Sequence, residues 1–231
     1  MRKNKKSVAV FDIDGTLFRS SLVIELVELL IEEGLFPESS RAVFQDEYDQ
    51  WVDRKGTYNE YIMKVVEAFK NYIQGIKEED VIRLSRDVLE QHKYKVYRYS
   101  RDLIDELKET HFLLTISHSP YYVVQPFAEF WGFDKAYAKL YSLDENKLFT
   151  GGIDGDELIM QKDKILERAI EKEGLTLEGS VGIGDTESDA AFLDMVERPI
   201  AFNPNSVLYE IARKNGWEVV VERKDVVYNI E

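Results

Sequence analysis

Short apolar segments that each end in a polar residue alternate with helical patterns along this chain. The clearest begins at Val8, where V-A-V-F runs directly into Asp12 and Asp14. Alternation of short buried strands with helices favours an α/β fold with a mostly parallel sheet that is covered on both faces. The expected strands lie at residues 7–11, 112–116, 135–138, 147–153, 181–184, 199–202 and 218–221.

Between the first two of these strands, residues 22–92 carry helical patterns and no strand-like segment. Glutamates at 25, 28 and 32 mark the solvated face of a helix that begins at residue 22. The T-x-x-E sequence that starts at Thr57 is a capping box, and the helix it opens is expected to run to Gly75. We therefore expect a helical insert.

The composition excludes several classes of function. A formal net charge of −14 gives no electrostatic footprint for phosphate backbones, so we expect no nucleic-acid partner. The chain has no cysteine, which removes disulfides, thiolate metal sites and cysteine nucleophiles. Only four apolar residues precede Asp12, too few for a signal peptide, and residues 22–31 are too short and too charged to span a membrane. We expect a cytoplasmic protein without membrane contact, and the sequence leaves its oligomeric state open.

Polar side chains stand where three of the expected strands end. Asp12 and Asp14 follow the first, Ser117 follows the second, and Asp185 with Asp189 follows the strand at 181–184. Ligands bind outside the carboxyl ends of parallel strands, so these residues are expected to converge at one sheet edge. Carboxylates without a His or Cys cluster suit Mg²⁺ better than zinc, and Mg²⁺ would relieve the repulsion between the acids. This donor set favours phosphate chemistry.

Four motifs together carry a family resemblance. D-I-D-G-T-L-F at 12–18 resembles the first motif of the haloacid dehalogenase-like (HAD) hydrolases, and G-D-T-E-S-D at 184–189 resembles the fourth. Ser117 at the end of a strand is similar to their second motif, and Lys162 at the start of a helix is similar to the third. The match extends from residue 8 to about residue 205, apart from the insert.

The resemblance implies a Rossmann-like doubly wound core with an inserted α-helical cap, as in the branch that contains phosphoserine phosphatases. The core would comprise residues 1–20 and 97–231, and the cap would comprise residues 21–96.

The resemblance also implies a role for each matched residue. Asp12 would be the nucleophile that forms an aspartyl-phosphate, and Asp14 would be the general acid and then the base. Asp12, the main-chain carbonyl of Asp14 and Asp185 would bind Mg²⁺, and Asp189 would bind a metal water or support the lysine. The phosphoryl group would be held by Thr16, Ser117 and Lys162.

Two lysines could fill the third motif. Lys162 lies at the expected start of a helix and 23 residues before Asp185, the spacing of the phosphoserine phosphatase branch. Lys164 lies about 200° further round the helix, so at most one of the two faces the site. We prefer Lys162.

The cap departs from phosphoserine phosphatases where those enzymes hold the amino acid. Ser21 stands at the position of their glutamate, with Glu25 one turn later, and Val65 stands where a cap arginine is expected. We therefore expect weak or absent phosphoserine activity. Ser21, Glu25 and His118, which follows the motif serine, are candidates for substrate contact, although for His118 we favour a solvated loop position.

The sequence thus predicts a Mg²⁺-dependent phosphatase that acts on a small phosphorylated metabolite. A phosphotransferase or phosphomutase on the same scaffold and a catalytically retired binding protein are the alternatives.

Overall fold

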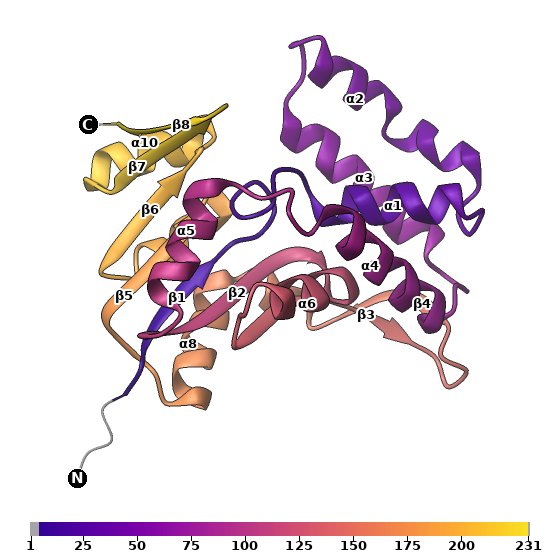
Figure 1. Ribbon diagram of the computed structural model, residues 1–231. Helices are drawn as coiled ribbons and strands as arrows, with labels where there is room; N and C mark the ends of the chain where they lie inside the picture. The colour runs from indigo at the N-terminus through magenta and orange to yellow at the C-terminus, as the bar shows by residue number, and fades with distance from the viewer. Residues whose placement is uncertain (1–4, 231) are drawn as a thin grey trace.

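A computed structural model describes residues 5–230, and of residues 156 and 157 the main chain only. Its centre is an eight-stranded sheet with the order β4-β3-β2-β1-β5-β6-β7-β8 (Figure 1). The β3–β4 and β7–β8 pairs are antiparallel and the other five pairs are parallel, which confirms the expected α/β class. The strands are β1 (Ser7–Phe11), β2 (His111–Pro120), β3 (Lys135–Leu143), β4 (Phe149–Asp154), β5 (Thr176–Gly184), β6 (Arg198–Phe202), β7 (Glu218–Arg223) and β8 (Val226–Ile230).

Helices cover both faces of the sheet, because successive residues of the central strands point to opposite sides. Ala9 and Phe11 of β1 belong to one buried apolar cluster, and Val8 and Val10 belong to the other. The first cluster is completed by α5 (Arg98–Leu107), α6 (Tyr121–Phe130) and the helices of the insert. The second is completed by α8 (Lys162–Glu173), α9 (Ala190–Leu193) and α10 (Ser206–Asn215), with Ile159 of the short helix α7 (Asp156–Ile159). The sheet is therefore doubly wound.

All the regular elements between β1 and α5 are helices. They are α1 (Leu22–Glu32), the 3₁₀ helix η1 (Glu38–Val43), α2 (Gln45–Val52), α3 (Tyr58–Tyr72) and α4 (Glu78–His92). The capping box forms as expected: the Glu60 amide donates to Thr57 Oγ1 at 3.1 Å and the Thr57 amide donates to Glu60 Oε2 at 2.8 Å. In Figure 1, α2 lies farthest from the sheet, whereas α1 and α4 lie over it.

The insert shares its apolar core with the sheet. Buried side chains of α1, α3 and α4 belong to the same cluster as those of β1, α5 and α6. The insert therefore packs against one face of the sheet. Its division from the core at residues 21 and 96 remains a prediction, and residues 1–4 and 231 of the predicted core lie outside the described residues.

A short antiparallel bridge joins the insert to the hairpin formed by β3 and β4. The Gly75 amide donates to the Phe149 carbonyl at 2.8 Å, and the Phe149 amide donates to the Ile76 carbonyl at 2.9 Å. The Glu78 amide donates to the Lys147 carbonyl at 2.9 Å, and Lys77 pairs with Leu148 between them. We call residues 75–78 and 147–149 the insert bridge.

Several strands differ from the expectation. Strand β3 continues to Leu143 and β5 already begins at Thr176, so both are longer than the expected segments 135–138 and 181–184. The second strand was expected to end at Ile116, but β2 continues to Pro120, where it pairs with Lys139 of β3 after an irregularity in register. The final strand β8 was not expected. It pairs with β7 and has largely exposed side chains, so no buried apolar pattern marked it.

Candidate active site

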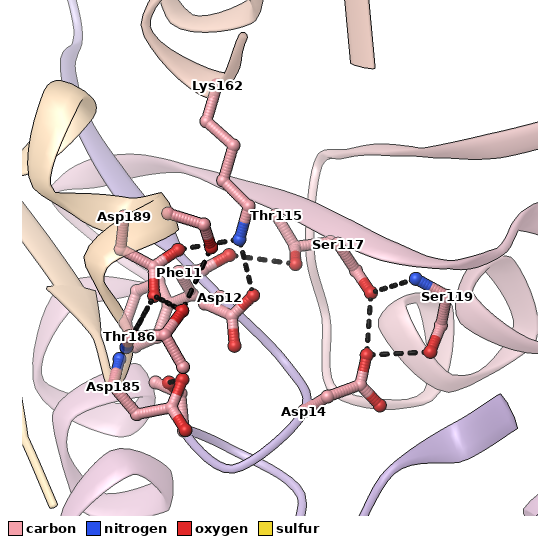
Figure 2. Close-up of polar contacts among 12 residues, drawn as sticks. Phe11, Asp12, Asp14, Thr115, Ser117, Ser119, Lys162, Asp185, Thr186 and Asp189 are labelled. Atoms are coloured by element: carbon pink, nitrogen blue, oxygen red, sulfur yellow. Dashed lines mark hydrogen bonds and ion pairs between the residues drawn. The ribbon is translucent and has the colours of Figure 1, made fainter. Parts of the chain in front are cut away.

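The site lies where the carboxyl ends of β1, β2 and β5 meet the start of α8 (Figure 2). Asp12 follows β1 directly and is 5% exposed. Its amide donates to the Ile183 carbonyl of β5 at 3.0 Å, and Thr115 Oγ1 of β2 donates to the Phe11 carbonyl at 2.9 Å. Hydrogen bonds to both neighbouring strands thus fix the main chain that carries Asp12.

Lys162 is buried between two of the carboxylates. Its Nζ atom lies 2.7 Å from Asp12 Oδ1 and 2.6 Å from Asp189 Oδ1, and the side chain is 2% exposed. Lys164, by contrast, is 49% exposed and pairs with Glu167 on the outer face of α8. Of the two candidate lysines, Lys162 is the one that faces the site.

Asp189 connects Lys162 to the loop after β5. Its Oδ2 atom accepts hydrogen bonds from the amides of Asp185 and Thr186, each at 3.1 Å. With Oδ1 on the lysine, both oxygens have partners within the protein. This geometry fits support of Lys162, one of the two roles implied for Asp189.

Two glycines permit the close packing of the loops. Gly15 has a φ of +85°, and a Cβ atom there would lie 2.1 Å from Asp185 Oδ2. A Cβ atom at Gly184 would lie 2.5 Å from Asp189 Cβ. Thr16, fully buried beside Gly15, has its hydroxyl 3.4 Å from Asp185 Oδ1, so its contact is with this carboxylate.

Asp14 lies at the edge of this group and is held by three donors, of which Figure 2 shows the two serines. The Leu22 amide donates to Oδ1 at 2.6 Å, and the hydroxyls of Ser117 and Ser119 donate to Oδ2 at 2.8 and 2.7 Å. Sequence reasoning missed Ser119. The sequence feature that could have identified Ser119 is the S-x-S spacing, because residues two apart in a strand lie on the same side of it.

Burial and like charge raise the pKa values of the clustered acids. Burial raises the pKa of Asp12 to about 7, helped by the charges of Asp189 and Asp14 and opposed by Lys162. Burial and the charges of Asp12 and Asp189 also raise the pKa of Asp185. For Lys162, burial lowers the pKa, but the two adjacent carboxylates outweigh it and the net shift is upward. The cluster carries more negative charge than one lysine neutralises.

The donor set fits a hard divalent cation. One carboxylate oxygen from each of Asp12, Asp185 and Asp189 lies within 4.8 Å of the others. Asp12 Oδ2 is buried and has no hydrogen-bond partner in the described part of the chain. A buried acceptor without a donor is unfavourable, and a cation bound by oxygen ligands would satisfy it.

His118 points away from Asp14, because it lies between Ser117 and Ser119 on the extended end of β2. Its Nε2 atom is buried without a partner among residues 5–230, and its ring bonds to the main chain of Ile159. Burial, with the charges of Lys162 and Lys139, lowers the pKa of His118 to about 3. The imidazole is therefore neutral.

Of the remaining substrate candidates, Ser21 directly precedes Leu22, whose amide donates to Asp14, whereas Glu25 pairs with basic residues of the insert. Ser21 is buried at the start of α1. The Glu25 carboxylate lies 2.7 Å from Lys95 Nζ and 3.3 Å from His92 Nε2, and Val65 is buried within the insert.

Tyr58, by contrast, approaches the site from the start of α3. Burial, then the charges of Asp14 and Asp185, raise the pKa of its hydroxyl, which has no partner among the described residues.

No helix within residues 5–230 has the length and apolar content needed to cross a bilayer.

Comparison with known proteins agrees with the motif resemblance. A family model described as haloacid dehalogenase-like hydrolase matches residues 9–194. The chain is 25% identical over 93% of its length to 78% of the "Inhibition of morphological differentiation protein" of Streptomyces azureus. It is 24% identical over 97% of its length to 96% of a phosphoserine phosphatase of Methanocaldococcus jannaschii.

A solved structure has the same fold. The phospho-aspartyl intermediate analogue of a phosphoserine phosphatase superposes with a TM-score of 0.61 at 22% identity, over 96% of both chains.

Proposed function

The chain belongs to the haloacid dehalogenase-like hydrolase family, and on this premise we propose that it is a Mg²⁺-dependent phosphatase of small phosphomonoesters. One observation carries the proposal. Asp12 is buried with Oδ1 bound to Lys162, while Oδ2 has no partner among the described residues. An acceptor held in this way is poised as a nucleophile. The phosphatases among the relatives support the same reaction class.

In the first step, a carboxylate oxygen of Asp12 attacks phosphorus and forms an aspartyl-phosphate. The bond from phosphorus to the ester oxygen breaks, and Asp14 protonates that oxygen so that it leaves as an alcohol. Lys162 and Ser117 hold phosphoryl oxygens, and Lys162 offsets charge as the phosphate approaches Asp12.

In the second step, water attacks the phosphorus of the aspartyl-phosphate. Asp14, now ionised, takes a proton from this water, inorganic phosphate leaves, and the Asp12 carboxylate is restored. Each turnover thus returns both aspartates to their starting protonation states.

The bound cation would be held by the carboxylates of Asp12 and Asp185, with the main-chain carbonyl of Asp14. When bound, Mg²⁺ supplies positive charge that neutralises the phosphoryl oxygens and the clustered acids. Asp189, with both oxygens engaged by Lys162 and main-chain amides, would reach it through water.

The position of the insert supports a small phosphorylated substrate. The start of α3 brings the half-buried Tyr58 near Asp14 and Asp185, so the insert covers the side from which a leaving group would enter. A covered site admits a small phosphorylated metabolite more readily than a folded protein. The net charge of −14 argues against nucleic acid. We propose a cytoplasmic setting, which the chain without cysteine suits.

Phosphate release from 4-nitrophenyl phosphate and from a panel of phosphorylated metabolites tests the proposal. The wild type with Mg²⁺ is expected to release phosphate, whereas Asp12→Asn should lose activity by at least about 10³-fold. Lys164→Met, on the exposed face of α8, is the matched control and should retain activity. Equal hydrolysis by wild type and Asp12→Asn would overturn the proposal. Product analysis with an added acceptor alcohol separates hydrolysis from phosphoryl transfer.

A further inference from the structure

Ser119 makes a buried contact with the proposed general acid that nothing in the four motifs requires. The residue is 3% exposed, and its hydroxyl donates to Asp14 Oδ2 at 2.7 Å. Ser117 donates to the same oxygen at 2.8 Å, and the Ser119 amide donates to Ser117 Oγ at 3.0 Å. The two serines and Asp14 form one connected set, which Figure 2 shows beside the Asp12 cluster.

The two serines face different tasks during the proposed reaction. Ser117 is the residue that would turn to a phosphoryl oxygen when a substrate binds, and it would then release Asp14. Ser119 lies two residues further along β2, on the same side of the strand, and has no such second task. Its bond to Asp14, together with the Leu22 amide on Oδ1, would persist.

We infer that Ser119 is a positioning residue, which holds Asp14 in place for proton transfer while Ser117 binds the phosphoryl group. The inference deepens the proposed function and rests on it. A hydroxyl suits this task because it donates to a carboxylate and can rotate to accept from a carboxylic acid. Ser119 can therefore stay bonded to Asp14 before and after the proton moves.

Two substrates with different leaving groups distinguish a positioning role of Ser119 from a general effect on the stability of the fold. An alkoxide needs a proton as it departs, whereas 2,4-dinitrophenolate is stable enough to leave without one, so only the alkyl ester depends on a well-placed Asp14. The value of kcat/KM reports the first step for both substrates. We expect Ser119→Ala to lower kcat/KM about 10- to 100-fold for an alkyl phosphate and markedly less for 2,4-dinitrophenyl phosphate.

Three variants sharpen the test. Ser119→Thr keeps a hydroxyl and should recover most of the rate on the alkyl phosphate. Asp14→Asn should show the same dependence on the leaving group, and adding Ser119→Ala to it should cause little further loss, since Ser119 acts through Asp14. Ser85→Ala is the control: this serine of α4 is equally buried, and its hydroxyl has no partner in the part of the chain that the structure describes.

Each outcome decides a separate question. If Ser119→Ala lowered kcat/KM equally for both substrates, the positioning role would be overturned. The same holds if Ser119→Ala lowered kcat/KM by its full factor again when added to Asp14→Asn. Unchanged kinetics of Ser119→Ala, given an active wild type and an inactive Asp12→Asn, would also overturn it. If Asp12→Asn matched the wild type, the proposed function itself would fail. Circular dichroism and thermal unfolding of each variant identify a loss that comes from misfolding.

Discussion

The ammonium group of Lys162 lies 2.7 Å from Asp12 Oδ1 and 2.6 Å from Asp189 Oδ1, so one buried cation joins the end of β1 to the short 3₁₀ helix Glu187–Asp189 that follows β5. Asp185 has no such lysine within hydrogen-bond distance in the described structure, and its pKa is raised by burial and by its acidic neighbours. The arrangement leaves a net negative site at the carboxyl end of a parallel sheet.

Replacing Lys162 should damage both stability and catalysis. Lys162→Met removes the partner of two buried carboxylates, and breaking a buried pair in this way costs about 3–5 kcal/mol of unfolding free energy. Phosphatase activity should fall by at least about 10²-fold, since Lys162 would no longer offset the charge of the phosphate. Lys164→Met removes only an exposed pair, which solvent screens, and should leave stability nearly unchanged. Denaturant unfolding measures the change in stability, and steady-state kinetics measures the change in activity. Similar results for Lys162→Met and Lys164→Met would contradict the assignment of Lys162 to the site.

The metal-free protein should lose stability as the pH rises. The pKa of Asp12 is raised from 3.8 to about 7, so the folded state retains a proton that the unfolded chain releases. The stabilising contribution is complete below about pH 4 and is lost as the pH rises through about 7. The melting temperature in chelator should therefore fall between pH 5 and pH 8, by about 2–4 °C for each kcal/mol lost.

Mg²⁺ should reverse most of this fall, because a bound cation stabilises the ionised carboxylates. Asp185→Asn removes one of the clustered charges and should flatten the pH dependence in chelator. A melting temperature that stays constant or rises over this range, with no response to Mg²⁺, would contradict the cation site.

Gly15 provides a test of loop packing. Gly15→Ala places a Cβ atom 2.1 Å from Asp185 Oδ2 at a φ of +85°, so the carboxylate has to move. We expect loss of Mg²⁺ binding, measured by calorimetry, and loss of phosphatase activity. Gly34→Ala is the matched control, since its φ is +71° and no atom lies within 4 Å of the added methyl group. It should cost about 1 kcal/mol of backbone strain and leave both measurements unchanged.

Phosphoserine should rank low in a panel of phosphorylated metabolites. Ser21 and Val65 are buried and uncharged, so neither supplies an ion pair for the amino or carboxylate group of an amino acid. The measurement is kcat/KM for each compound at saturating Mg²⁺. Phosphoserine with the highest value would show that other residues of the insert replace these two.

The sequence predicted the central site because its residues are tied to strand ends. Asp12 and Asp185 follow apolar segments directly, and parallel strands bring such ends to one edge whatever the helices between them do. Helical geometry allows only one of Lys162 and Lys164 to face the site, and the position of Lys162 at the helix start, 23 residues before Asp185, favoured it. The resulting cluster draws on segments that are up to 177 residues apart, Asp12 and Asp189 being its extremes.

The contacts that the sequence did not predict depend on pairing with distant strands. Ser119 was outside the expected strand because Ser117-His118-Ser119-Pro120 resembles a turn in sequence, whereas in the structure Pro120 pairs with Lys139 and the strand continues. Strand β8 was likewise not predicted, because it is defined by its antiparallel pairing with β7. The continuous core of the insert and the sheet was equally hidden, because amphipathic faces show that a helix is buried without showing what covers it.

The insert bridge limits how the proposed active site could open. The chain enters and leaves the insert beside Phe18 and Val96, which pair with each other, and residues 75–78 attach it to the β3–β4 hairpin at a separate place. Because the insert is attached at both places, swinging it as a whole away from the sheet would break three main-chain hydrogen bonds and uncover apolar side chains. Helix α2 has no fully buried side chain, so we expect substrate to enter by movement of α2 and the start of α3, which carries Tyr58, rather than of α1 and α4.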